Sequence, residues 1–284
     1  MCDELFESAI MNRRQFHEAS LSMALTLLLP GTAKVLPTTD ADVNVKTPDG
    51  KADCYYVHPV AGAHAGVIIW PDLLGLRPAF RKMGKRLAES GYSVLVVNPY
   101  YRHRHAPVVP AGITSGEEAA RKIVMPLAEA LTVQRTMSDA KAFVEFMDDQ
   151  RSVDRKRKIG SAGFSIGAPI VMRTAASNPN RIGASATFYG RDLVTNGPDS
   201  PHLLIPKMKG QFLVAIAEDD DQQDPAMKDT LKESFATANL PAEVEVYGAA
   251  HGWCSPDSAV YNKFMAERAW TRLLLLFNGA LASN

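Results

Sequence analysis

The residue with the clearest chemical potential is Ser165, in the segment Gly163-Phe164-Ser165-Ile166-Gly167, which matches the pattern G-x-S-x-G. Residues 158–164 before it are typical of a buried strand, and a helical pattern covers 166–176. A serine on such a sharp turn presents its hydroxyl above the sheet, because flanking glycines leave room for the surrounding backbone. This context predicts a nucleophile. The alternative is a glycine-rich turn with an incidental serine.

A serine hydroxyl becomes a good nucleophile only when a base takes its proton, so a histidine must come within hydrogen-bond reach. Of the seven histidines, His251 is the one that follows a predicted strand, 244–247, and precedes the last predicted helix. A loop at this position lies at the carboxyl edge of a parallel sheet, over the expected place of Ser165. We therefore predict that His251 is the base.

A third residue, a carboxylate, should hold the histidine and stabilise its charged form. The predicted strand 212–217 leads directly into Glu218-Asp219-Asp220-Asp221, which lies between the serine and the histidine in the chain. The order nucleophile, acid, histidine is that of the α/β-hydrolases. We choose Asp220, keep Asp221 as the alternative, and expect the first two acids to form a solvated turn.

The elements that would position these residues alternate between short β-branched runs and helical patterns from Val43 onward, as in a mostly parallel sheet covered by helices. Strands are predicted at 66–70, 92–97 and 185–189. A helix between the first two begins near Pro78 and ends before Gly91. Further helices are predicted at 133–147 and from about 256 to 277. The pattern contains no repeat or long linker, so we predict one doubly wound α/β domain over residues 41–284.

The composition limits the classes to which the protein can belong. Its 284 residues fit one large α/β domain, and 46% hydrophobic with 22% charged residues is ordinary for a soluble globular protein. Lys plus Arg and Asp plus Glu both number 31, so no global field attracts nucleic acid or an anionic membrane. The three cysteines form no disulfide framework, and no Cys, His, Asp and Glu cluster has metal-ligand spacing. We expect neither a metal nor a nucleic-acid partner.

Residues 1–40 resemble a bacterial twin-arginine export signal. Arg13-Arg14-Gln15-Phe16 precedes an apolar stretch from Ala19 to Leu29, and small residues follow. The apolar run is shorter than the ~18 residues of a membrane span, so no stable membrane anchor is expected. The sequence predicts export to the periplasm or the medium by the export machinery, with cleavage near 33–37. The alternative is an amphipathic N-terminal helix on a cytoplasmic enzyme.

Taken together, the segments from about Val43 to the C-terminus resemble the dienelactone hydrolase family of α/β-hydrolases. The residues that carry the resemblance are Asp72-Leu73-Leu74-Gly75-Leu76, Gly91-Tyr92, Asn98-Pro99-Tyr100-Tyr101-Arg102, Gly163-Phe164-Ser165-Ile166-Gly167, Ala217-Glu218-Asp219-Asp220 and His251-Gly252-Trp253. The resemblance implies the α/β-hydrolase fold, with Ser165 where the family usually has a cysteine nucleophile. It also implies that the backbone N–H groups of Leu73 and Ile166 form the oxyanion hole.

The resemblance further suggests residues that bind the substrate. Asp72 occupies the place of a carboxylate that touches the nucleophile in family members, where Glu is commoner. Arg102 stands where an arginine grips a carboxylated substrate, and a surface ion pair is its alternative role. A second such arginine is replaced by Ser255, so we expect a substrate other than dienelactone. Tyr100 and Trp253 are candidates for the wall of an apolar pocket.

These residues predict a hydrolase of small carboxylic esters or lactones that needs no cofactor. The serine attacks the carbonyl, the histidine transfers the proton, the aspartate orients the histidine, and water releases the acyl group from the acyl-enzyme. Two alternatives stay open. One is an acyltransferase or perhydrolase on the same fold, and the other is a noncatalytic binding protein whose triad has lapsed.

Overall fold

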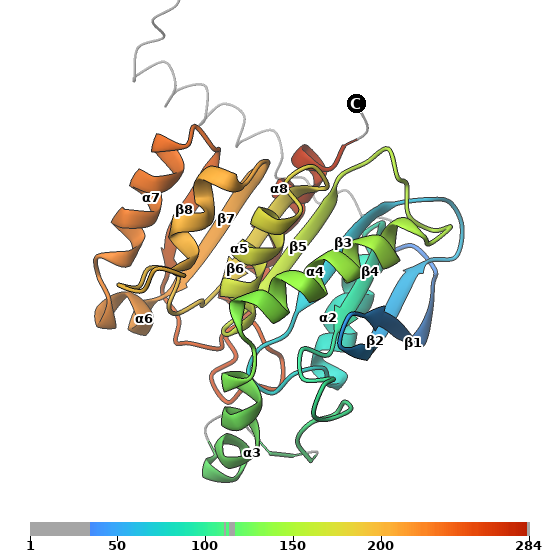
Figure 1. Cartoon of the computed structure of the whole chain (residues 1–284), viewed down its shortest axis with the longest axis horizontal. Helices are drawn as coiled ribbons and strands as arrows, with labels where there is room; N and C mark the ends of the chain where they lie inside the picture. The colour runs from blue at the N-terminus through green and yellow to red at the C-terminus, as the bar shows by residue number, and fades with distance from the viewer. Residues whose placement is uncertain (1–34, 111, 114–116, 283–284) are drawn as a thin grey trace, which may run out of the picture. The chain divides into compact units, whose positions relative to one another are not determined.

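The structure is a computed structural model that describes residues 35–110, 112–113 and 117–282 (Figure 1). Its strands are β1 (Thr38–Thr47), β2 (Gly50–Pro59), β3 (Ala65–Trp70), β4 (Tyr92–Val97), β5 (Ile159–Phe164), β6 (Ile182–Phe188), β7 (Gln211–Ala217) and β8 (Ala242–Tyr247). Its helices are α2 (Pro78–Glu89), α3 (Glu118–Glu129), α4 (Val133–Asp148), α5 (Gly167–Ser177), the 3-10 helix η1 (Pro201–Lys207), α6 (Glu218–Gln223), α7 (Met227–Thr237) and α8 (Lys263–Ala280).

The strands of the described residues form one sheet in the order β1-β2-β4-β3-β5-β6-β7-β8. The pairs β1–β2 and β2–β4 are antiparallel, and every other neighbouring pair is parallel. Consecutive parallel strands are joined by helices, because a parallel connection must cross back over the sheet. The predicted doubly wound, mostly parallel sheet of the α/β-hydrolase type is therefore confirmed, and the described residues from Leu36 onward form a single compact unit.

Each face of the sheet packs against its own layer of helices, because successive side chains of a strand point to opposite faces. In β3, Ile68 and Trp70 belong to the hydrophobic layer that includes side chains of α4, α5 and α7. Val67 and Ile69 belong to the layer that includes side chains of α2 and α8. Figure 1 shows α4 and α5 in front of the sheet, with α2 and α8 behind it. With both faces covered, the strand ends are the places left for a site.

The carboxyl ends of the parallel strands meet at one edge of this sheet. In Figure 1 this is the lower edge, where α6 follows β7 and where α3 projects away from the body of the molecule. The loops after β3, β5, β6, β7 and β8 therefore converge there. Helix α3 was not predicted from the sequence.

Most predicted bounds agree with the structure to within two residues, and three do not. Strand β6 begins at Ile182, three residues before the predicted start at 185. Strand β4 coincides with 92–97, and Gly91 after α2 has the positive φ (98°) expected of a helix C-cap. The last helix begins at Lys263 rather than near 256, because Asn262 caps it by accepting a hydrogen bond from Met265 N–H (3.1 Å). Strand β1 begins at Thr38, so the domain extends three residues beyond the predicted boundary at 41. The predicted leader otherwise lies almost wholly outside the described residues.

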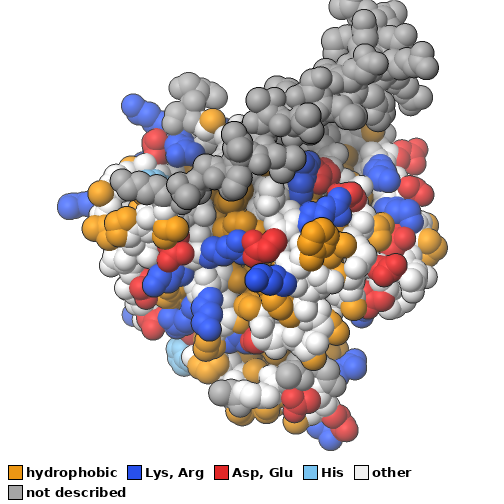
Figure 2. Space-filling model, turned by 180° about the vertical axis from the view of Figure 1, so that it is seen from behind, with side chains coloured by type: hydrophobic (Ala, Val, Ile, Leu, Met, Phe, Trp, Pro, Cys, Tyr) orange, Lys and Arg blue, Asp and Glu red, His pale blue; other side chains and the backbone are white. Residues whose placement is uncertain are grey.

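The face that carries α2 and α8 has charges of both signs. Figure 2 shows Lys and Arg side chains interspersed with Asp and Glu side chains there, rather than gathered into one large patch. Several are paired, such as Arg86 with Glu267 and Arg268 with Glu245 (both 2.5 Å). In the ranges that the structure describes, no helix has both the length and the apolar character needed to cross a membrane.

Candidate active site

The turn between β5 and α5 holds Ser165 in a left-handed backbone conformation, with a φ of 52°. Residues other than glycine seldom adopt this region, and holding one there costs about 1–3 kcal/mol. The surrounding backbone fixes it: Ser165 N–H donates to the carbonyl of Phe188 on β6, and the Ser165 carbonyl accepts from Ala168 N–H (both 3.0 Å). Ser165 lines a cleft at the carboxyl edge of the sheet.

Close packing around this turn explains both glycines of the motif. A Cβ on Gly167 would lie 2.8 Å from the carbonyl oxygen of Pro71 and closer still to that of Trp70. A Cβ on Gly163 would overlap the backbone of Gly167. The atoms in the way are backbone atoms, which cannot move aside as a flexible side chain can. The contact between β5, the start of α5 and the end of β3 therefore requires glycine at both positions.

His251 and Asp220 continue a chain of hydrogen bonds that starts at Ser165. The Oγ of Ser165 is 2.8 Å from Nε2 of His251, and Nδ1 of His251 is 2.7 Å from Oδ2 of Asp220. An ionised carboxylate can only accept, so Nδ1–H donates to Asp220, and Nε2 is left to accept from the serine hydroxyl. The three residues follow β5, β7 and β8, whose carboxyl ends lie at the same edge. The structure thus brings the predicted triad residues together.

The environment of Asp220 keeps its carboxyl group charged. Its side chain is 1% exposed, and its Oδ1 accepts a hydrogen bond from Nε of Arg191 at 2.5 Å. Burial by itself would raise the pKa of Asp220, but hydrogen bonds from His251 and Arg191 outweigh burial and hold the pKa below its ordinary value. Asp220 is therefore ionised at neutral pH, which is the state that can stabilise a protonated His251.

The other acids after β7 have different partners. Asp221 pairs with Nζ of Lys228 at 2.7 Å and makes no contact with the histidine, so the choice between the two aspartates falls on Asp220. Asp219 corrects the prediction of a solvated turn, because its Oδ1 accepts from the backbone N–H of His251 at 2.8 Å. Asp219 thus fixes the histidine loop while Asp220 orients the ring.

The predicted oxyanion-hole residues Leu73 and Ile166 both line the cleft that contains Ser165. Within the part of the chain that the structure describes, neither backbone N–H donates to a protein acceptor. Both groups are therefore available to a ligand oxygen. Asp72 shapes the turn that carries Leu73, because its Oδ1 accepts from Leu74 N–H at 3.0 Å.

Arg77 joins this turn to the histidine loop. Its Nη1 and Nη2 donate to the carboxylate of Asp72 (2.6 and 3.0 Å), and its Nε and Nη2 donate to Asp257 (2.7 and 2.9 Å). Asp72 also accepts from the hydroxyl of Ser255 at 3.0 Å. The carboxylate predicted to touch the nucleophile is thus bound by Arg77 and Ser255 instead, and it makes no hydrogen bond to Ser165, whose hydroxyl contacts the histidine.

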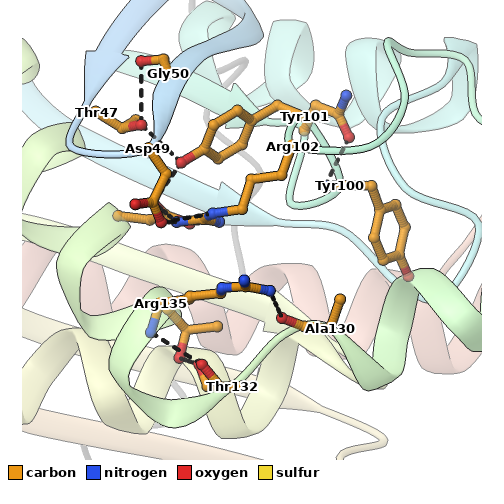
Figure 3. Close-up of polar contacts among 12 residues, drawn as sticks. Thr47, Asp49, Gly50, Tyr100, Tyr101, Arg102, Ala130, Thr132 and Arg135 are labelled. Carbon is orange, nitrogen blue, oxygen red and sulfur yellow. Dashed lines mark hydrogen bonds and ion pairs between the residues drawn. The ribbon is translucent and has the colours of Figure 1, made fainter.

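Arg102 does not line the cleft, contrary to the prediction that it binds substrate. Its Nη1 and Nη2 donate to the two carboxylate oxygens of Asp139 on α4 (both 2.7 Å), and its Nε donates to Asp49 (2.8 Å). Figure 3 shows the guanidinium of Arg102 against Asp49, below the ring of Tyr101. The side chain is only 8% exposed, and all three guanidinium nitrogens donate to these two carboxylates. Arg102 ties the turn between β1 and β2 to α4.

Tyr100 and Trp253 support the site from within the protein and do not line the cleft, which corrects the prediction of a pocket wall. The hydroxyl of Tyr100 donates to the carbonyl of Leu73 at 2.8 Å, and its ring is buried. Trp253 is fully buried, stacked on Tyr247 (centroids 5.3 Å apart) and edge-on to Tyr189 (5.1 Å). Both aromatic residues hold loops that carry functional groups.

The cleft over the triad has a volume of about 680 Å³, within the range of sites that bind small molecules. Its lining combines apolar side chains from α3 and α5 with four arginines, at positions 77, 121, 173 and 191, and four aspartates, at positions 72, 192, 199 and 257. Among the residues described, no three His, Cys, Asp or Glu side chains gather where they could hold a metal ion.

Two of the residues that the sequence analysis missed follow β6, at the same edge as the triad. They are Arg191, which binds Asp220, and Tyr189, whose ring stands edge-on to His251 (centroids 5.1 Å apart). The rule that placed the other residues at strand ends would have found both of them. Arg77 and Asp257 lie 180 residues apart and carry no such signal.

A family model and several known proteins are similar to this chain in sequence or in fold. The family model described as the dienelactone hydrolase family matches residues 52–281. The carboxymethylenebutenolidase of Rhodococcus opacus is 25% identical over 261 residues, which covers 85% of this chain and 93% of that protein. A crystal structure of a candidate dienelactone hydrolase from Klebsiella pneumoniae has a TM-score of 0.73 at 21% identity, covering 85% of this chain and 98% of that one. The dienelactone hydrolase of Anabaena variabilis has a TM-score of 0.62 at 16% identity, covering 86% and 99%.

Proposed function

The chain belongs to the dienelactone hydrolase family, and from this premise we propose that it hydrolyses carboxylic esters or lactones with Ser165, His251 and Asp220 as its triad. The family makes the chain a hydrolase and supplies the class of substrate. The observation that carries the choice of residues is the chain of hydrogen bonds from the serine hydroxyl through the imidazole to the buried carboxylate. With serine as the nucleophile, the covalent intermediate is an oxygen ester.

In the first half of the proposed reaction, Oγ of Ser165 bonds to the carbonyl carbon while its proton passes to Nε2 of His251. The negative charge that develops on the carbonyl oxygen is stabilised by the backbone N–H groups of Leu73 and Ile166, each worth about 2.7–4 kcal/mol in comparable sites. The tetrahedral intermediate collapses, and the leaving alcohol takes the proton from Nε2. Asp220 stabilises the transient imidazolium throughout.

In the second half, water enters the place of the leaving group. His251 takes a proton from the water as it attacks the acyl-enzyme, and the same oxyanion hole receives the charge. Collapse of the second intermediate releases the acid and returns the proton to Oγ of Ser165. For a lactone, the alcohol and the acid are two ends of one molecule, so the ring opens without loss of a fragment.

Replacement of Ser165 by Ala tests the proposal. We expect kcat for a short p-nitrophenyl ester to fall by a factor on the order of a million, as in other serine triads. Ser177→Ala on α5, outside the cleft, is the matched control and should keep the wild-type rate. A fluorophosphonate probe should label the wild-type protein at Ser165 and leave the Ala variant unlabelled.

If Ser165→Ala keeps its rate within about tenfold of wild type, the assignment of the nucleophile is wrong. A folded wild-type protein that neither turns over esters nor accepts the probe would support the noncatalytic alternative. Product analysis with added alcohol or peroxide separates hydrolysis from acyl transfer and perhydrolysis, because only transfer would divert the acyl group from water.

A further inference from the structure

Arg173 lies on the wall of the cleft, on the same face of α5 as residues close to the nucleophile. Ile166, Pro169, Ile170 and Arg173 all line the cleft, and residues three or four apart share one face of a helix. From Ile166 to Arg173 the helix axis advances roughly 10 Å, at about 1.5 Å per residue. One helix face therefore leads from the oxyanion hole to a cation.

The guanidinium of Arg173 has no protein partner among the described residues. Its Nε is shielded from solvent without a hydrogen bond, and none of its nitrogens forms an ion pair. Of the other arginines in the cleft, Arg77 and Arg191 are bound to carboxylates, and Arg121 on α3 is exposed to solvent. Burial lowers the pKa of Arg173, and the carboxylate of Asp199 only partly opposes this. Asp199 also lines the cleft but forms no ion pair with Arg173, so the half-buried guanidinium keeps free donors for an anion.

Two walls of the cleft between Ser165 and Arg173 are apolar, whereas Asp192 and Asp199 line it from the segment after β6. Ile166, Pro169 and Ile170 line it from α5, and Met125 and Leu131 line it from the segment at α3. Such a surface suits a hydrocarbon chain, which gains from leaving water. At its far end, the planar fork of an arginine suits the two oxygens of a carboxylate.

We infer that the acyl half of the substrate carries a carboxylate at the end of an apolar spacer, and that Arg173 binds this carboxylate while the scissile carbonyl lies against Ser165. The inference rests on the proposed function and makes Arg173 a specificity residue. The anion site is distinct from Arg102, whose fork is bound by Asp139 and Asp49.

The test uses p-nitrophenyl monoesters of adipic, suberic and sebacic acids, each compared with the same compound whose distal carboxylate is capped as a methyl ester. The measured quantity is the ratio of kcat/KM for the free acid to that for the capped compound. In the wild-type protein we expect the ratio to reach at least about tenfold at the best spacer length, because a charge-assisted hydrogen bond favours the acid.

Three variants locate the effect. Arg173→Met should bring the ratio to about one, whereas Arg173→Lys, which keeps the cation but loses the planar fork, should keep only part of the preference. Lys141→Met removes an exposed cation from α4, outside the cleft, and should keep the wild-type ratio. If Arg173→Met does not fold, the wild-type ratio still shows whether a distal carboxylate is preferred. A ratio that falls in Arg173→Lys still shows that residue 173 is responsible.

Two results would overturn the inference. One is a wild-type protein that hydrolyses the capped esters, is labelled at Ser165 and shows no preference for the free acids at any spacer length; the proposed function would then stand without this specificity. The other is an Arg173→Met variant with the wild-type ratio. If the wild-type protein hydrolyses neither series and is not labelled, the proposed function fails and the inference fails with it.

Discussion

Asp220 uses its two carboxylate oxygens for two different partners. Oδ2 faces Nδ1 of His251, and Oδ1 faces Nε of Arg191. A buried carboxylate keeps its charge only when it is paired and hydrogen-bonded, so Arg191 supports the ionised state that the triad needs. Arg191 is itself about half exposed, at 48% of its side chain, and can be changed without opening the core.

Replacement of Arg191 by Gln should lower the stability of the fold by an amount that depends on pH. The variant loses one of the two hydrogen bonds that lower the pKa of Asp220, so that pKa rises toward or above its ordinary value of 3.8. A carboxyl group whose folded pKa is depressed stabilises the fold above its unfolded pKa and loses that contribution as pH falls through the folded pKa. We therefore expect the variant to be less stable than wild type at pH 7, by about 1–3 kcal/mol.

Urea unfolding between pH 7 and pH 3 checks this expectation. The gap in unfolding free energy between wild type and Arg191→Gln should be full near neutrality and should close as Asp220 takes up its proton below about pH 3.8. Arg155→Gln is the control. Because Arg155 pairs with the exposed Asp149, its loss should change the unfolding free energy by only about 0–1 kcal/mol at any pH. A gap for Arg191→Gln that is independent of pH would contradict the argument.

The side chains of Asp220 and Arg102 mark where sequence reasoning succeeds and where it stops. The order of residues in the chain and the position just after β7 limited the acid that pairs with His251 to Asp220 or Asp221. Successive residues of a helix point about 100° apart, and the rotation of α6, which no motif encodes, turns one inward and the other toward Lys228. For Arg102, the resemblance predicted a ligand, whereas the packing of α4 beside the turn between β1 and β2 supplies Asp139 and Asp49.

The contact of α5 with β5 and the end of β3 is the element-level feature on which the nucleophile depends. Because Gly167 touches backbone carbonyls of Trp70 and Pro71, any added atom pushes the start of α5 away from the sheet. Ser165 lies two residues before Gly167 and would move with it. Stability and activity are therefore linked at this turn.

Gly167→Ala should destabilise the fold by about 1–3 kcal/mol, the usual cost of forcing an extra carbon into a packed site. It should also lower kcat for a short ester, because the serine hydroxyl moves relative to His251. Gly279→Ala on α8 is the matched control: nothing lies within 4 Å of its added Cβ, so the better helix propensity should stabilise by about 0.5–1 kcal/mol. Chemical denaturation of both variants measures the difference, and equal midpoints would refute the packing argument.

Among the elements, those with strong local patterns were predictable and those fixed by distant contacts were not. The short apolar runs of β3, β4, β5 and β7 predict buried strands from their composition alone. The turns at 251–262, before α8, depend on Arg77, which holds Asp257 from a position 180 residues earlier in the chain. No window of local sequence contains that information.

The candidate site residues all lie at one edge of one sheet. Residues from five separate loops meet there because the parallel strands all point the same way. This explains why the order of serine, acid and histidine in the chain was enough to predict that these three side chains meet, although they lie up to 86 positions apart. The lining of the cleft, to which α3 contributes, could not be predicted in this way.

We propose that residues 1–40 direct export, a role that falls outside the described residues. In a bacterium with twin-arginine export, the full chain should deliver esterase activity to the periplasm in a shortened form, and Arg13→Lys with Arg14→Lys should leave it uncut in the cytoplasm. Arg151→Lys, in the loop before β5, is the control for a general effect of losing arginine. Unchanged periplasmic activity in the double variant would disprove the role of the arginine pair.

The bridge from Asp72 through Arg77 to Asp257 has a consequence for redesign. It fastens the turn that carries the proposed oxyanion donor Leu73 to the loop that carries the proposed base His251, so we expect that neither can be exchanged alone. A chimera with a relative's histidine loop but no acid at position 257 would lose the hydrogen bonds from Nε and Nη2 of Arg77 to that acid. The turn that carries Asp72 would then be held less firmly, because Arg77 also binds Asp72. Chimeras should therefore transplant residues 72–77 and 251–262 as one cassette.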